Sequence, residues 1–177
     1  ISSTSVAVTG VVLDQQSLEL EINETAKLTA TVLPENATNK EVTWSSSDES
    51  KATVDAAGNV KAVSTGSVTI TVTTNDGGKT TSCAVTVKRI DLSGAEVSGL
   101  EGSYSYTGSE IEPKPTVTLN GIPLADGTDY KVTYQNNQEV GTATVTIEGI
   151  NDYQGRVTRN FDITSTSVAV TGVVLDQ

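Results

Sequence analysis

The chain has 177 residues, of which 36% are hydrophobic and 4% aromatic, and it carries a formal net charge of −11. Such an acidic surface argues against nucleic acid as a partner, because phosphate binding needs a basic face. The chain contains no histidine and one cysteine, which excludes a Ser-His-Asp triad, a Cys-His pair and a zinc site built from His or Cys. No apolar run is long enough to insert into a membrane as a helix.

The opening stretch STSVAVTGVVLDQ, residues 3–15, occurs again at residues 165–177. Duplicates this similar mark arrays in which one folded unit is repeated along the chain. We therefore expect one period of a longer tandem array, with residues 165–177 as the start of the next repeat. One period has room for two small domains, which we predict at residues 1–88 and 89–164.

The first half alternates apolar and polar residues with a period of two, as in Leu18, Leu20 and Ile22 or in Val68, Ile70 and Val72. This alternation is typical of half-buried β-strands. Turn-forming stretches rich in Gly, Asn, Asp and Pro separate the runs, and no helical stripe is present. The pattern predicts an all-β fold made of two tandem Ig-like β-sandwiches. The core residues expected in the first half are Trp44, Val54, Ile70 and Cys83, with Cys83 a buried thiol and not a reactive one.

Motifs along the first half occur in a familiar order, and residues ~5–88 resemble the bacterial Ig-like domain group 2 (BIG2) family. The motifs are Gly10-Val11-Val12-Leu13, Leu18-Glu19-Leu20, Leu28-Thr29-Ala30, Val32-Leu33-Pro34, Val42-Thr43-Trp44, Ala52-Thr53-Val54, Gly58-Asn59-Val60 and Val68-Thr69-Ile70-Thr71-Val72. The resemblance implies an Ig-like sandwich of the kind found in extracellular bacterial proteins.

The second half continues the strand pattern at Ala143, Val145 and Ile147. Tyr130, Tyr134 and Phe161 are its expected core aromatics, and an exposed aromatic platform for a sugar is the alternative. Residues ~91–163 resemble a small all-β repeat that follows BIG2 units in surface proteins of gut Gram-positive bacteria. The motifs are Tyr106-Thr107-Gly108, Gly127-Thr128-Asp129-Tyr130, Val132-Thr133-Tyr134, Gly141-Thr142-Ala143 and Tyr153-Gln154-Gly155.

The connector Val87-Lys88-Arg89-Ile90-Asp91 has neither a Gly/Ser run nor a Pro run, so we expect little hinge freedom and a semi-rigid array whose partners are neighbouring repeats. Residues 168–177 are identical to residues 6–15. They could therefore replace that strand in another molecule and produce head-to-tail self-association.

Acidic loops and strand lysines are candidates for two further kinds of site. Asp126, Asp129, Asp76 and Asp152 are weak calcium candidates, because none forms a complete calcium loop and ordinary Asx turns on an acidic surface are the simpler explanation. Lys27, Lys61 and Lys131 fall on the solvent phase of their strands, which argues against an internal isopeptide bond. We predict no cofactor beyond calcium and no enzymatic activity, because small sandwiches seldom build a cleft that holds paired carboxylates.

The sequence therefore predicts a stalk or spacer repeat of a bacterial cell-surface or secreted fibrous protein. Two alternatives remain open. One is an adhesin module that binds a host glycan or matrix protein. The other is a filament subunit that assembles by strand exchange.

Overall fold

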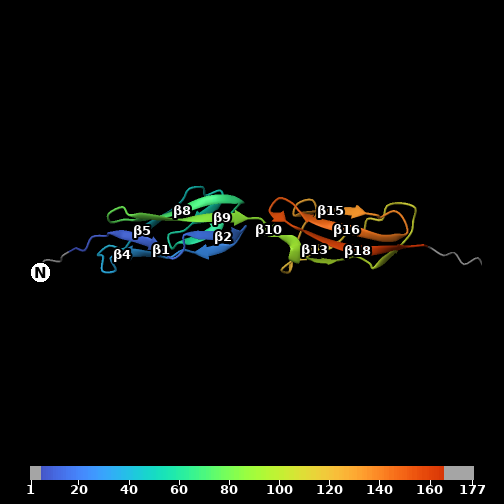
Figure 1. Ribbon diagram of the computed structural model, residues 1–177, viewed down its shortest axis with the longest axis horizontal. Helices are drawn as coiled ribbons and strands as arrows, with labels where there is room; N and C mark the ends of the chain where they lie inside the picture. Colours follow the sequence, from blue (N-terminus) through green and yellow to red (C-terminus); the bar gives the residue numbers. More distant parts are fainter. Residues whose placement is uncertain (1–4, 166–177) are drawn as a thin grey trace, which may run out of the picture. The chain divides into compact units, whose positions relative to one another are not determined.

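The computed structural model describes residues 5–165. Within this range the regular elements are β-strands and one short 3-10 helix, η1 (Leu92–Gly94), and there is no α-helix (Figure 1). The prediction of an all-β fold is confirmed. The chain divides into two compact units, Ile1–Ile90 and Asp91–Gln177, and each is described by itself. Independent folding of the two predicted domains stays a prediction, and the strand 168–177 lies outside the described residues.

The strands of the first unit form a four-stranded sheet, β2-β9-β8-β5, a three-stranded sheet, β3-β7-β6, and a two-stranded pair, β1-β4. All pairs are antiparallel except β2 with β9. In chain order the strands are β1 (Gly10–Leu13), β2 (Ser17–Glu21), β3 (Thr25–Lys27), β4 (Ala30–Leu33), β5 (Val42–Ser46), β6 (Ala52–Val54), β7 (Asn59–Ala62), β8 (Gly66–Thr74) and β9 (Thr80–Lys88).

The core of the first unit lies between the four-stranded and three-stranded sheets. Strand alternation turns Ile70 and Cys83 inward, and neither is exposed to solvent. Burying each large aliphatic side chain contributes roughly 1.5–3 kcal/mol. The buried cluster consists of Leu20, Ile22, Leu28, Ala52, Val60, Ala62, Val68, Ile70, Cys83, Val85 and Val87.

A second cluster packs beneath the β1-β4 pair. Its buried members are Val8, Val11, Val32, Ala37 and Val72. The first strand of the chain therefore covers its own apolar patch, and its backbone is held by β4 in the register Gly10↔Leu33 to Leu13↔Ala30.

Two of the expected core residues of the first unit are only half-buried. Trp44 lies on β5, at the edge of the four-stranded sheet, and contacts both apolar clusters. Val54 lies on β6, at the edge of the three-stranded sheet. An edge strand has a neighbour on one side only, so part of each side chain stays in contact with water.

The second unit has a four-stranded sheet, β12-β18-β16-β15, a three-stranded sheet, β11-β13-β14, and a short pair, β10-β17. Here too one pair is parallel, β12 with β18. The strands are β10 (Ile90–Asp91), β11 (Glu96–Ser98), β12 (Ser103–Ser105), β13 (Thr116–Leu119), β14 (Ile122–Pro123), β15 (Tyr130–Gln135), β16 (Gly141–Gly149), β17 (Tyr153–Gln154) and β18 (Arg156–Thr164).

The core of the second unit is centred on Phe161, which is 2% exposed and meets the ring of Tyr104 edge-on at 5.2 Å between centroids. Tyr130 is buried as expected for a core ring, whereas Tyr134 is half-buried because β15 is an edge strand. The buried cluster consists of Leu92, Ala95, Val117, Tyr130, Ala143, Val145, Ile147, Val157, Phe161 and Ile163.

Candidate functional site

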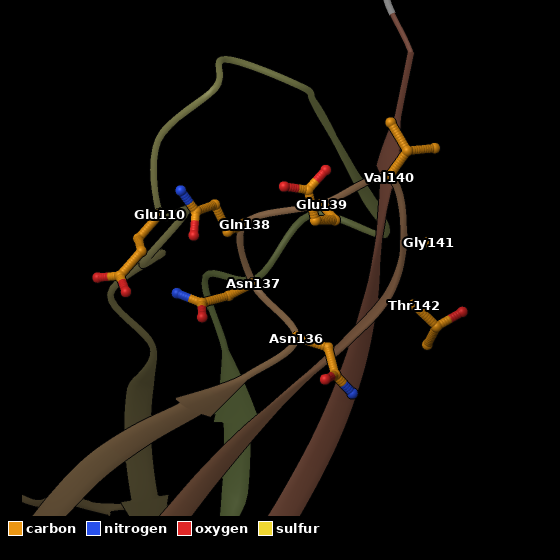
Figure 2. A pocket seen from close by; sticks show the side chains of 8 residues that line it. All are labelled: Glu110, Asn136, Asn137, Gln138, Glu139, Val140, Gly141 and Thr142. Carbon is orange, nitrogen blue, oxygen red and sulfur yellow. The ribbon is translucent and has the colours of Figure 1, made fainter.

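The second unit has a hollow of about 370 Å³ at the loop between β15 and β16 (Figure 2). In Figure 2 the Asn137 and Gln138 side chains point toward the side where Glu110 lies, while Val140 lies beside the end of β18. The lining residues are Glu110, Asn136, Asn137, Gln138, Glu139, Val140, Gly141 and Thr142.

Local backbone chemistry holds this loop in place. Asn136 ends β15 with a positive φ of 56°, a conformation that asparagine adopts more readily than most residues. Asn137 then joins the loop to the facing segment, because its carbonyl accepts from the Ile111 N–H at 2.8 Å and its side-chain amide donates to the Ile111 carbonyl at 3.3 Å. The hollow therefore presents amide and carboxylate groups on a tied loop, which suits ligands that carry hydroxyl groups.

A second hollow of about 450 Å³ lies along β15 and is lined by Glu112, Lys114, Pro115, Asp126, Val132, Thr133 and Tyr134. The Tyr134 hydroxyl donates to the Pro113 carbonyl at 2.5 Å. Partial burial, followed by the nearby Glu112 and Asp126 carboxylates, raises the pKa of Tyr134, so its phenol stays protonated. The hydrogen bond from this side chain therefore positions the backbone at Pro113.

The calcium candidates lie in turns of their own units and form no metal-binding group among the described residues. Asp76 belongs to the β8–β9 turn and accepts from the Val8 N–H at 3.2 Å. Asp129 accepts from the Ala125 N–H at 2.8 Å and closes a turn that also contains Asp126. Asp152 lies in the turn between β16 and β17.

Within residues 5–165 there is no group of three or more Asp, Glu or Cys side chains close enough to hold a metal ion. Calcium prefers six to eight oxygen ligands, so the structure lends the calcium prediction no support. The carboxylates of Asp76 and Asp129 instead accept backbone hydrogen bonds within their own unit.

The strand lysines considered for a cross-link all face solvent. Lys27, Lys61 and Lys131 are exposed, and Lys131 forms an ion pair with Glu148 at 2.9 Å. Lys114, whose position between two prolines the sequence does not settle, is also exposed. An isopeptide bond needs a lysine in an apolar core, and these four lysines do not provide one.

Three aromatic rings of the second unit pack within it and do not form an exposed platform for a sugar. Tyr130 and Phe161 are buried, and the hydroxyl of half-buried Tyr104 accepts from the Glu101 N–H at 2.8 Å. Sequence reasoning missed Tyr104, although its phase with the core strands could have indicated it. Tyr106 keeps 37% of its surface exposed beside the end of β18.

The contact between Asp76 and Val8 was also missed, because the sequence does not reveal that the β8–β9 turn reaches the segment that precedes β1. The nearby Thr74 is buried, with its hydroxyl donating to the Asp76 carbonyl and accepting from the Lys79 N–H. These bonds rigidify the turn and satisfy the buried hydroxyl.

The two facing sheets of the first unit define an Ig-like β-sandwich. Comparison with protein families makes the assignment specific, because residues 7–85 match the bacterial Ig-like domain (group 2). This part of the chain is therefore a group 2 bacterial Ig-like domain, as its motifs indicate. Domains of this type are non-catalytic modules.

Two curated relatives match parts of this chain. An Ig-like virion protein of Serratia phage KSP90 is 48% identical over 88 residues, which cover 49% of this chain and 34% of that protein. An alpha-L-arabinofuranosidase of Bifidobacterium longum subsp. longum is 43% identical over 102 residues, which cover 58% of this chain and 10% of the enzyme. The chain spans between 9% and 34% of the length of the first three curated relatives it matches.

Among solved structures, surface layer protein SbsC (domains 4-9) aligns with 90% of this chain and 32% of its own, at 17% identity and a TM-score of 0.40. No helix in residues 5–165 has the length and apolar character needed to cross a membrane.

Proposed function

We propose that this chain is a non-catalytic spacer repeat of a bacterial cell-surface or secreted protein, which separates functional parts of that protein and carries tension along its length. The group 2 Ig-like domain supports this role, as does its occurrence in relatives where the matched region is a small share of a much longer chain. In the arabinofuranosidase it would be an accessory module.

The single observation that carries the proposal is the parallel pairing of an early strand with the last strand in each unit. In the first unit β2 pairs with β9 from Ser17↔Ala84 to Glu21↔Lys88. The ladder is flanked by Ala84 N–H donating to the Gln16 carbonyl at 2.9 Å and Ile22 N–H donating to the Lys88 carbonyl at 3.1 Å. In the second unit β12 pairs in the same way with β18.

A parallel pair formed by an early strand and the last strand of a unit resists tension well for a geometric reason. Force on the two chain ends acts at opposite ends of the β2–β9 pair, so the strands slide past each other and their hydrogen bonds are loaded together. If force acted at the same end of the pair, the bonds would break one after another. Forced unfolding is governed by the unfolding rate, and a larger force is needed to reach a given rate when the hydrogen bonds must break together.

Single-molecule pulling on the full chain tests this proposal. Handles on the chain termini load β2–β9 in shear, whereas handles on the variants Ser17→Cys and Ser82→Cys, both exposed positions near one end of the pair, load it in peeling. We expect the first unit to rupture at clearly higher force in shear. Equal rupture forces in the two geometries would remove the mechanical basis of the proposal.

Ligand binding is the second candidate function, and the hollow at the β15–β16 loop is the observation that favours it. Its amide groups can donate hydrogen bonds to the hydroxyl groups of a glycan, and its amide and carboxylate oxygens can accept hydrogen bonds from them. A glycan array and a matrix-protein pull-down with the full chain separate the two functions. Saturable binding that is lost in Gln138→Ala would favour the adhesin module over the spacer.

A further inference from the structure

Two exposed apolar side chains flank the last residue of β18. Tyr106 N–H donates to the Thr164 carbonyl at 2.8 Å on one side of this strand end. On the other side Gly141 pairs with Ile163, which brings Val140 next to Thr164. Val140 is 54% exposed and Tyr106 37% exposed, so both remain open to contact at this end of the unit.

Two carboxylates line the hollow next to this strand end. In Figure 2 Glu139 lies on the Val140 side of the hollow and Glu110 on the opposite side, and both are exposed. Neither forms an ion pair within the residues that the structure describes. We call this end of the second unit, defined by Tyr106, Glu110, Glu139 and Val140, the exit face.

The exit face is followed along the chain by a repeated segment, because residues 168–177 are identical to residues 6–15. Only three residues separate Thr164 from position 168, and four extended steps of the backbone reach roughly 14 Å at most. A following copy of the first unit, begun by this repeated segment, would therefore be held very close to the exit face.

The structure also shows which part of the first unit lies next to residues 6–8, and this part would face the exit face in a following copy. Val6 is joined to Thr38 by two hydrogen bonds, Val6 N–H to the Thr38 hydroxyl at 2.8 Å and Thr38 N–H to the Val6 carbonyl at 3.0 Å. Val8 N–H donates to Asp76. The entry face of the first unit is therefore formed by the loop 35–41 and the turn 75–79.

The entry face offers two cations that suit the exit face. Lys40 and Lys79 are exposed, and neither forms an ion pair among the described residues. Three acids, Glu35, Glu41 and Asp76, share this face; Glu41 and Asp76 are held by hydrogen bonds from Asn75 and Val8, so the proposal depends on where the two lysines stand and not on the net charge of the face. Lysine stems can cover apolar side chains while their ammonium groups meet carboxylates.

We propose that the exit face is a docking surface for the entry face of a following copy of the first unit, with Glu110 and Glu139 facing Lys40 and Lys79 of that copy across Tyr106 and Val140. The inference rests on the proposed spacer function and deepens it, because docking at this junction makes successive repeats stiff. A tether of three residues gives a high effective concentration, so a weak interface suffices.

Hydrogen exchange on an extended protein tests the docking. The chain 1–177 is continued with residues 16–90 of the same sequence, which completes a second copy of the first unit, and it is compared with the chain 1–177. We expect the amides of residues 138–140 to exchange about tenfold more slowly in the extended protein, as for a docked fraction of roughly nine tenths at millimolar effective concentration. Added salt should reduce the effect, because exposed charge pairs are screened.

Charge exchange identifies the surface. Glu110→Lys together with Glu139→Lys should abolish the protection. Adding Lys40→Glu and Lys79→Glu to this variant, in the added copy of the first unit only, should restore it. Glu96→Lys and Ile122→Ser, exposed positions on the β11-β13-β14 sheet, serve as controls and should leave the protection unchanged.

Equal exchange in the two proteins would overturn the docking, and protection that survives the Glu110→Lys, Glu139→Lys double substitution would overturn this surface. Either failure leaves the shear measurement on the first unit untouched. Conversely, saturable glycan binding would refute the spacer; because the hollow shares Glu110, Glu139 and Val140 with the exit face, the exchange experiment is run without glycan, and its result then stands by itself.

Discussion

Gly58 is the residue at which the sandwich of the first unit tolerates no side chain. It has a φ of +82°, and a Cβ placed on it would lie 2.5 Å from the Leu28 carbonyl oxygen and 2.9 Å from Cζ2 of Trp44. The turn is further tied by Leu28 N–H donating to the Gly58 carbonyl at 2.9 Å. Gly58→Ala therefore adds backbone strain and a steric clash at the same place.

The two costs can be separated within the same unit. Gly78 also has a positive φ, +57°, but nothing lies within 4 Å of its Cβ position, so Gly78→Ala measures the backbone cost alone. That cost is about 1–2 kcal/mol. The clash in Gly58→Ala adds about 1–3 kcal/mol, as overpacking does in other cores. A domain of this size has a free energy of unfolding of roughly 4–13 kcal/mol, so Gly58→Ala removes a large share of it.

Urea unfolding monitored by tryptophan fluorescence measures both variants. Trp44 is the single tryptophan of the chain, so its signal reports on the first unit. With a slope near 1 kcal/mol per molar urea, the midpoint of Gly58→Ala should fall by about 2 M or more. A midpoint no lower than that of Gly78→Ala would refute the reasoning, because the contacts with Leu28 and Trp44 would then carry no energy.

Burial and hydrogen bonding lead to three more predictions. The Asn59 side chain donates to Asp55 and is the main cause of the lowered pKa of this carboxyl. The contribution of this hydrogen bond to the stability of the first unit is therefore present above the ordinary carboxyl pKa and disappears as the pH falls through the lowered value. Urea midpoints measured over an acid pH series should show that Asp55→Asn lowers the stability of the first unit at neutral pH and reduces the further loss of stability as the pH falls. A midpoint that falls with pH as steeply as in the unsubstituted chain would contradict this. Phe161→Ala should lower the free energy of unfolding of the second unit by about 3–5 kcal/mol, measured by calorimetry, while the Trp44 transition stays in place; a shift of that transition would contradict independent folding. Burial raises the pKa of the Cys83 thiol, so a thiol reagent should label it only as the chain unfolds, and rapid labelling of the native protein would show that the site opens.

Much of the strand architecture was predictable because a half-buried strand leaves a two-residue period in the sequence. The inward phases of Ile70, Cys83 and Phe161 are of this kind, and each is buried. The phase of a residue does not tell whether its strand is central or at an edge, however. Trp44 and Tyr134 have the inward phase but lie on edge strands, so they are half-buried.

The candidate sites were less predictable, because they depend on which loops meet. The acidic loops considered for calcium looked alike in the sequence, yet Asp76 accepts from the Val8 backbone, before β1, and Asp129 closes its own turn. The hollow beside β18 was missed altogether. Its two sides, at Glu110 and at residues 136–142, are more than twenty residues apart and are joined by Asn137.

The sequence alone therefore determined the all-β class, the group 2 Ig-like domain and the repeated segment at residues 165–177, since each is written in local periodicity or in identical letters. Only the tertiary structure decided that each unit closes with a parallel strand pair, and that Tyr106 and Val140 flank the end of β18 next to a hollow lined by two carboxylates. Strand order and loop proximity arise from contacts between distant residues, and no local pattern encodes those contacts.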